Sequence, residues 1–354
     1  MDSTTFRALY ALSGRIDRGQ SISELVRSIK ELGYTAYYKN IYDKCQKLKE
    51  DNIVQIGKAG MTSLVSLKLS NPLTIDELAT MELMRKKEFL EGADSQLIRG
   101  VESMRFSSIT SSALIEPERN RKLNTLELLF LLDSDQEADV IIKGIKEISR
   151  KYNKTIYPLL LTEREFKGRL EAQGYNTVKE MLTNKIVLEN PSAFWRTISD
   201  AKISGNAGVD LRGINSGELY QNLEGFGYSA FTTNHTEKIQ DLSVETAIIA
   251  CLLKDDARLT EAAAVLIAKN QVNSRLLLYL GLKYGRLNLL GYLMETVKTL
   301  TRDDDKRAAL AVGLALFSVF HERASSDTIA GGWGVETRTT AQDLENTLRR
   351  YNAT

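Results

Sequence analysis

The first seventy residues carry apolar positions at helical spacing three times and then switch to alternation. The three helical sets are Phe6, Leu9, Tyr10 and Leu12; Ile22, Leu25, Val26, Ile29 and Leu32; and Tyr38, Ile41, Cys45 and Leu48. Residues three and four apart share one helix face, so each set predicts a helix with one buried side. Apolar residues then alternate with Ser66 and Lys68 after a Gly-Lys-Ala-Gly turn at 57–60, which predicts a β-hairpin.

Polar residues mark the ends of these helices. Ser21 and Glu24 form a Ser-x-x-Glu capping box, and Gly33 stands where a helix end favours a left-handed residue. The third helix is expected from Thr35 to about Glu50. Four residues that lie one position before its apolar seam, about 100° around the helix, are Tyr37, Asn40, Lys44 and Lys47.

From residue 107 to 195 the pattern alternates between strands and helices. The run 126–132 is apolar except for Glu127, which suits a strand buried on both faces. A helical pattern over 138–151 and a short strand over 155–161 follow. A second capping box, Thr162 with Glu165, then opens another helix. This order predicts a small sheet with helices packed on it.

The last third of the chain is helical by periodicity and contains no proline. All four prolines stand at or before Pro191, which leaves 163 residues without one (354 − 191). Helical patterns recur over 244–253, 260–269, 276–284, 287–300, 307–323 and 341–351. Short polar breaks between these helices predict an antiparallel bundle.

Together these patterns predict a multidomain α+β protein. Its expected parts are three helices and a hairpin over 1–72, a small α/β domain over 73–203, and a helical bundle over 241–354. The α/β domain is expected to start with a leading helix, opened by a capping box of Thr74 and Glu77. Between the last two parts, 204–240 is rich in glycine and predicts a linker or irregular segment.

Composition narrows the possible functions. Lys and Arg number 47 against 46 Asp and Glu, a formal charge of +1, so any nucleic-acid surface has to be local. Two cysteines and two histidines argue against a zinc cluster or a disulfide scaffold. No apolar run approaches eighteen residues and the first ten residues do not read as a signal peptide, so we expect a cytoplasmic protein without a membrane partner.

The order helix, helix, helix, hairpin over residues 3–70 resembles the winged helix-turn-helix family of DNA-binding domains. In that family the second helix of the pair enters the major groove and the hairpin wing touches the DNA backbone. Carried over by position, the resemblance implies that double-stranded DNA faces Thr35, Tyr37, Lys39, Asn40, Lys44 and Lys47, with Lys58 at the wing tip.

The local charge agrees with that assignment. Residues 35–70 hold six lysines and three acidic residues, a net charge of +3. Lysine suits phosphate as a point charge, and the Asn40 amide suits a base edge. Winged helices also serve as protein-interaction or dimerisation modules, and a charged helix face is commonly only solvated, so these alternatives stay open.

The stretch 156–166, a strand that leads into Leu-Thr-x-x-Glu-Phe, resembles the minimal nucleotidyltransferase family. Members carry Gly-Ser for the triphosphate, Asp-x-Asp for two metal ions and a further acid on the later strand. At the corresponding places this chain has Ser111-Ser112-Ala113, Thr125-Leu126-Glu127 and Tyr157-Pro158. Because two-metal chemistry needs its carboxylates, the resemblance implies a catalytically degenerate module.

Three carboxylates remain as weak catalytic candidates. Glu127 is the one acid left of the Asp-x-Asp pair, and Asp133 and Asp135 follow the carboxyl end of a buried strand, where acid pairs can bind Mg²⁺. Asp and Ser are also common turn residues, so a solvated acidic loop is the plainer interpretation.

The sequence thus favours a DNA-binding transcriptional regulator whose nucleotidyltransferase-like domain serves ligand sensing or assembly. We expect no metal site and no cofactor, and the chain is more consistent with a non-enzyme. A nucleotide or small-molecule effector and a homodimer are compatible with this interpretation. The alternatives are an active Mg²⁺-dependent nucleotidyltransferase that acts on a nucleic-acid or protein target, and a protein-interaction scaffold.

Overall fold

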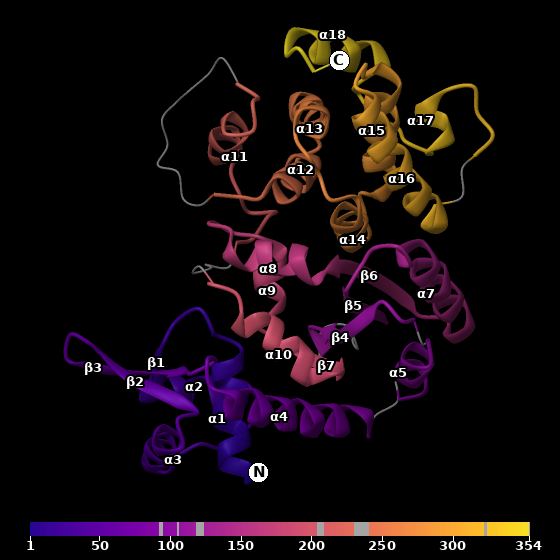
Figure 1. Ribbon diagram of the computed structural model, residues 1–354. Helices are drawn as coiled ribbons and strands as arrows, with labels where there is room; N and C mark the ends of the chain where they lie inside the picture. The colour runs from indigo at the N-terminus through magenta and orange to yellow at the C-terminus, as the bar shows by residue number, and fades with distance from the viewer. Residues whose placement is uncertain are drawn as a thin grey trace.

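The computed structural model describes residues 1–91, 95–104, 106–117, 124–203, 209–229, 241–321 and 324–353. Among these residues the chain combines many helices with two small sheets, a mixed α+β architecture. Three parts follow one another in space: the N-terminal elements at the bottom of Figure 1, a four-stranded sheet in the centre and a group of helices at the top. No helix within the described residues is long and apolar enough to cross a membrane.

The N-terminal part consists of three helices and a three-stranded sheet. Its elements are α1 (Ser3–Ser13), β1 (Gln20–Ser21), α2 (Ile22–Glu31), α3 (Tyr38–Glu50), β2 (Val54–Ala59) and β3 (Thr62–Leu67). The strands pair antiparallel in the order β1-β3-β2. The capping box of Ser21 and Glu24 forms as predicted at the start of α2.

Two details of this part differ from the sequence prediction. Ile41, Cys45 and Leu48 of α3 are buried, but Tyr38, assigned to the same seam, is 55% exposed, because the buried seam of α3 starts one turn later at Ile41. The hairpin turn falls at Gly60 and Met61, since Ala59 pairs with Thr62. Gly60 has a φ of +60°, a left-handed conformation that glycine adopts without strain.

A long helix, α4 (Pro72–Leu90), connects the N-terminal part to the central sheet. Its cap is Asn71 with Pro72 in the first turn, so the predicted box of Thr74 and Glu77 does not open it. Thr74 is buried and its hydroxyl donates instead to the carbonyl of Ile53 at 3.2 Å. This bond ties the start of α4 to the hairpin.

The central part is built around a sheet with strand order β6-β5-β4-β7. Its elements are α5 (Ser95–Glu102), β4 (Ile109–Ile115), β5 (Thr125–Leu132), α7 (Ala138–Tyr152), β6 (Thr155–Thr162), α8 (Glu163–Glu171), α9 (Thr177–Met181), β7 (Lys185–Glu189) and α10 (Pro191–Ser199). β5 and β6 run parallel, while β4 is antiparallel to both of its neighbours. The apolar run in β5 is buried throughout, as its pattern predicts.

The C-terminal part is helical within the described residues. It comprises α11 (Ser216–Glu224), α12 (Val244–Leu252), α13 (Ala257–Lys269), α14 (Ser274–Tyr284), α15 (Leu287–Leu300), α16 (Asp304–Phe320), α17 (Ile329–Gly332) and α18 (Ala341–Arg350). α11 lies inside the segment 204–240 that was expected to be irregular, because Asn215 caps it and Leu219 and Leu223 are buried. Residues 204–208 and 230–240 of that segment are outside the described residues.

Buried polar contacts join the three parts. The fully buried Glu82 of α4 accepts from the backbone N–H of Val187 in β7 at 3.0 Å. On the other side of the sheet, Arg169 of α8 donates from both terminal nitrogens to the Glu245 carboxylate of α12, each at 2.6 Å. The central sheet is therefore fixed to the N-terminal part through α4 and to the helical part through α8.

Candidate functional site

One face of α3 is open to solvent and carries most of the residues that the sequence assigned to DNA. The exposed members of that assignment are Thr35, Tyr37, Lys39, Asn40 and Lys47. The opposite side of the helix packs inward through Ile41, Cys45 and Leu48, which fixes the direction in which the exposed face points. We refer to these five exposed residues as the α3 face.

The turn before α3 has a side-chain contact from α1 at its start but no side-chain cap where it meets the helix. Arg7 of α1 donates to the carbonyl of Thr35 at 3.0 Å, and its guanidinium lies 5.5 Å from the centre of the Tyr34 ring. At the helix itself, Tyr37 occupies the cap position without a side-chain hydrogen bond to the first turn. The backbone N–H groups of that turn are therefore not occupied by a side-chain cap, and helix N-termini of this kind suit anions.

Lys44 differs from the rest of the assigned set. Its ammonium donates to Oδ2 of Asp2 at 2.8 Å, and its side chain is only 20% exposed. The hydrogen bond from Lys44, together with that from the Thr5 backbone, holds the pKa of Asp2 far below its usual range. Asp2 also caps α1, so its ion pair with Lys44 links α1 to α3. The same pair partly neutralises the positive charge that Lys44 would offer to DNA.

Lys58 is exposed but does not stand at the tip of the hairpin. It lies in β2 opposite Ser63, one pair before the pair of Ala59 and Thr62. The tip is occupied by Gly60 and by Met61, whose side chain is fully exposed. The sequence placed the turn over all four residues 57–60, whereas the strand register pairs the first three of them and leaves the turn at Gly60 and Met61.

Sequence reasoning missed two exposed aromatic residues of α3, which lie on a different side of the helix from Asn40 and Lys47. Tyr38 and Tyr42 are 55% and 43% exposed, and their rings stack with centroids 6.4 Å apart and planes within 8°. Spacing alone placed Tyr38 inside, and Tyr42 was not assigned. One sequence signal could have identified them. Tyr38 and Tyr42 are four residues apart, which places them one turn apart on the same side of a helix, directly after Tyr37.

Glu127, which the sequence resemblance assigned to a nucleotidyltransferase metal site, is buried, and its carboxylate already has hydrogen-bond partners. Its carboxylate accepts from the Tyr279 hydroxyl and from Lys283 Nζ, the latter at 2.9 Å. Burial, and then the charge of Glu127, raise the pKa of Tyr279 well above its usual value, so this phenol stays protonated and donates. Both partners come from α14, more than 150 residues later, and nothing in the local sequence around Glu127 signals them.

Asp133 and Asp135 lie beyond the end of β5 and are both exposed. Asp135 is 3.5 Å from the guanidinium of Arg275, which also binds Glu165 at 2.8 Å. No group of three His, Cys, Asp or Glu side chains within the described ranges could hold a metal ion. The structure therefore does not bring Glu127, Asp133 and Asp135 together as one site.

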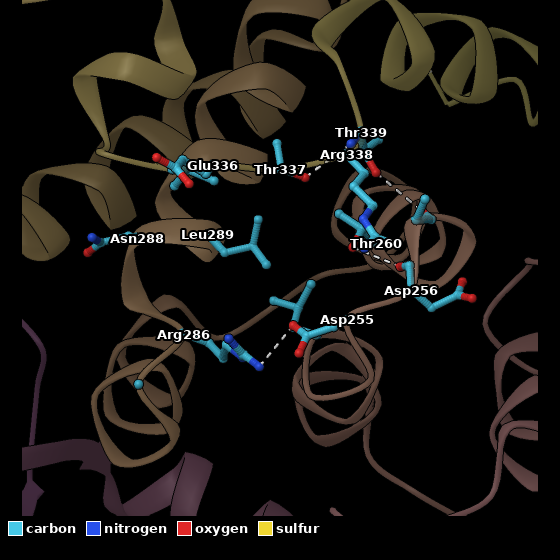
Figure 2. Close-up of a pocket in the computed structure, with 14 residues that line it drawn as sticks. Asp255, Asp256, Thr260, Arg286, Asn288, Leu289, Glu336, Thr337, Arg338 and Thr339 are labelled. Carbon is cyan, nitrogen blue, oxygen red and sulfur yellow. Dashed lines mark hydrogen bonds and ion pairs between the residues drawn. The ribbon is translucent and has the colours of Figure 1, made fainter.

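A cavity of about 470 Å³ opens in the C-terminal part, among the turn between α12 and α13, the turn between α14 and α15, and the loop 335–339. Figure 2 shows Arg286 directed toward Asp255, and the two side chains pair at 3.2 Å. Asp256 caps α13 by accepting from the backbone N–H of Leu259. Arg286, Asp255 and Asp256 are thus engaged in the fold, and none of the residues that the sequence assigned to DNA or to catalysis lines the cavity.

Comparisons with protein-family models, with curated proteins and with solved structures find no match for this chain. Its function therefore has to be argued from its own residues.

Proposed function

We propose that this protein is a DNA-binding transcriptional regulator whose N-terminal part is a winged helix-turn-helix. The order α1, β1, α2, α3, β2, β3 and the sheet order β1-β3-β2 support the winged-helix assignment. In this arrangement α3 is the recognition helix and the β2–β3 hairpin is the wing.

The observation that carries the proposal is the composition of the α3 face. Lys39 and Lys47 supply charge for phosphates, Asn40 supplies an amide for a base edge, and their helix is held from behind by a buried seam. The Tyr37 ring, which is 70% exposed, adds apolar surface that can contact thymine methyl groups.

The second half of the proposal concerns the central sheet, which we infer to be a nucleotidyltransferase-like module without phosphoryl transfer. The carboxylate of Glu127 already accepts hydrogen bonds from the Lys283 ammonium and the Tyr279 hydroxyl, where a metal ion would need to bind. Incorporation of labelled nucleotide by the purified chain, abolished by Glu127→Gln, would instead favour the Mg²⁺-dependent alternative.

Selection of bound DNA tests the regulator function. The purified chain is incubated with fragmented genomic DNA, and the retained fragments are sequenced. We expect a shared sequence among them, and we expect Asn40→Ala to relax the preference at one or two positions while Asn288→Ala, in the bundle cavity, leaves the preference unchanged. If the retained fragments had the same sequence composition as the input DNA, sequence-specific binding would be contradicted. The protein-interaction scaffold would then be the favoured interpretation.

A further inference from the structure

A second cavity, of about 320 Å³, lies where the N-terminal part meets the central sheet. Its lining residues are Tyr10, Glu31, Leu32, Tyr34, Arg85, Glu88, Phe89, Pro117, Asn184 and Ile186. They come from α1, the end of α2, the turn before α3, α4 and the central part. This volume is at the lower end of the range for small-molecule sites.

The apolar wall of this cavity is aromatic. Tyr10 and Tyr34 meet edge to face with ring centroids 6.3 Å apart, and Phe89, which is buried, completes the wall. A guanidinium already lies over one face of each tyrosine ring, Arg85 over Tyr10 and Arg7 over Tyr34, so this wall suits the flat apolar part of a ligand.

The charged lining is predominantly negative. Glu31 and Glu88 both stand exposed at the cavity, and Glu88 accepts from the Tyr34 hydroxyl at 3.1 Å. Arg85 is the cation among the lining residues. It is buried over the Tyr10 ring at 3.6 Å, and the fully buried carboxylate of Glu82 lies 3.5 Å away.

Tyr34 connects the cavity to the α3 face. It immediately precedes Thr35, and Arg7 contacts both residues, through the Tyr34 ring and the Thr35 carbonyl. Burial, followed by the charge of Glu88, raises the pKa of Tyr34 to about 12, so its hydroxyl remains a donor at neutral pH. A ligand that changes the position of Tyr34 would therefore also shift the turn that leads into α3.

We propose that this cavity binds a small organic cation, an amine or guanidinium joined to a flat apolar body, and that it is the effector site of the regulator. The ligand's cation lies between the Glu31 and Glu88 carboxylates, and its apolar body lies against Tyr10, Tyr34 and Phe89. The effector role rests on the proposed DNA-binding function, whereas the ligand site does not.

Calorimetry with the full chain tests the ligand site directly. The probe is tryptamine, with indole-3-propionate as an anion that carries the same ring. We expect saturable binding of tryptamine, and about fivefold weaker binding of it by the double variant Glu31→Gln with Glu88→Gln, since both carboxylates are exposed and screened. Glu224→Gln, an exposed substitution at the end of α11, should leave the affinity unchanged.

The effector role is tested by repeating the DNA titration with saturating tryptamine. We expect tryptamine to change the DNA affinity of the native chain, and we expect the double variant to need about fivefold more tryptamine for the same change. Three results would overturn the ligand site. The first is that indole-3-propionate binds as tightly as tryptamine or more tightly, and the second is that tryptamine shows no saturable binding up to about 10 mM. The third is that the double variant binds tryptamine as tightly as the native chain does. Binding of tryptamine without an effect on DNA affinity would overturn the effector role, and binding by a chain that retains no DNA would overturn the proposed function while supporting the site.

Discussion

Lys283 Nζ lies 2.9 Å from Oε2 of Glu127, and both side chains are more than nine-tenths buried although 156 residues separate them in sequence. The pair fixes α14 against the central sheet. It also places a positive charge beside the carboxylate that the proposed nucleotidyltransferase resemblance assigns to a metal site. One contact therefore bears on both the stability of the central part and its proposed lack of metal chemistry.

Removing one partner of this pair should be costly. Glu127→Gln leaves the Lys283 ammonium buried without a counter-charge, and we expect the free energy of unfolding to fall by about 3 kcal/mol. Urea denaturation followed by circular dichroism measures this. The double variant Glu127→Gln with Lys283→Met should recover part of the loss, and a double variant whose effect equals the sum of the two single effects would show that the pair is not coupled.

The pair of Arg169 and Glu245 should hold the helical part against the sheet. Glu245 is fully buried and also accepts from the backbone N–H of Asn273 at 2.9 Å. Arg169→Ala should therefore destabilise the chain by about 3 kcal/mol and raise hydrogen exchange in α8 and α12. Arg286→Ala, which breaks an exposed pair with Asp255, is the matched control and should cost less than about 1 kcal/mol. Equal effects of the two substitutions would refute this role of Arg169.

Lys185 predicts an unusual dependence of stability on pH. It is buried, and desolvation lowers its pKa from 10.5 to about 8. Between about pH 8 and 10.5 the unfolded chain therefore binds more protons than the folded chain at this residue, so its contribution to stability rises as pH increases. Urea denaturation of the native chain and of Lys185→Met across this range should differ by a slope of up to about 1.4 kcal/mol per pH unit. If the free energies of unfolding of the two proteins changed in parallel with pH, the lowered pKa of Lys185 would be contradicted.

Asp2 should restrain DNA binding by neutralising Lys44. Asp2→Asn keeps a side chain that can cap α1 but removes the charge that binds Lys44 at 2.8 Å, so we expect DNA affinity to rise severalfold. Lys47→Met should weaken DNA binding more than Lys44→Met does, because Lys47 is exposed and Lys44 is already paired. Fluorescence anisotropy with a labelled duplex measures the affinities of all three variants. A lower DNA affinity for Asp2→Asn than for the native chain would contradict the restraining role of Asp2.

Features set by neighbouring residues were predictable from sequence. The capping boxes of Ser21 with Glu24 and of Thr162 with Glu165 both form, because each depends on residues three positions apart. The same spacing in Thr74 and Glu77 gives no box, because Asn71 caps that helix and Thr74 bonds to Ile53. The buried strand β5 was predictable for a similar reason, since a continuous apolar run leaves little choice of environment.

Features set by distant residues were not predictable. Helical spacing assigned Lys44 to an outward face, but its partner Asp2 is 42 positions away. Glu127 was identified as the remaining carboxylate, yet its partners on α14 follow only from the packing of the helical part on the sheet. Tyr38 fitted the apolar spacing, and only the tertiary structure shows that the seam begins at Ile41.

The most direct test of the account is the salt dependence of duplex binding by the variant Lys39→Glu with Lys47→Glu. The control Lys143→Glu with Lys202→Glu changes the net charge equally at exposed sites away from α3. Each lysine that contacts a phosphate contributes about 0.9 to the slope of log affinity against log salt concentration. We predict that the first variant loses about two units of slope and at least about tenfold in affinity, while the control behaves as the native chain. Indistinguishable affinities and slopes for the two variants would contradict the proposal that α3 binds DNA.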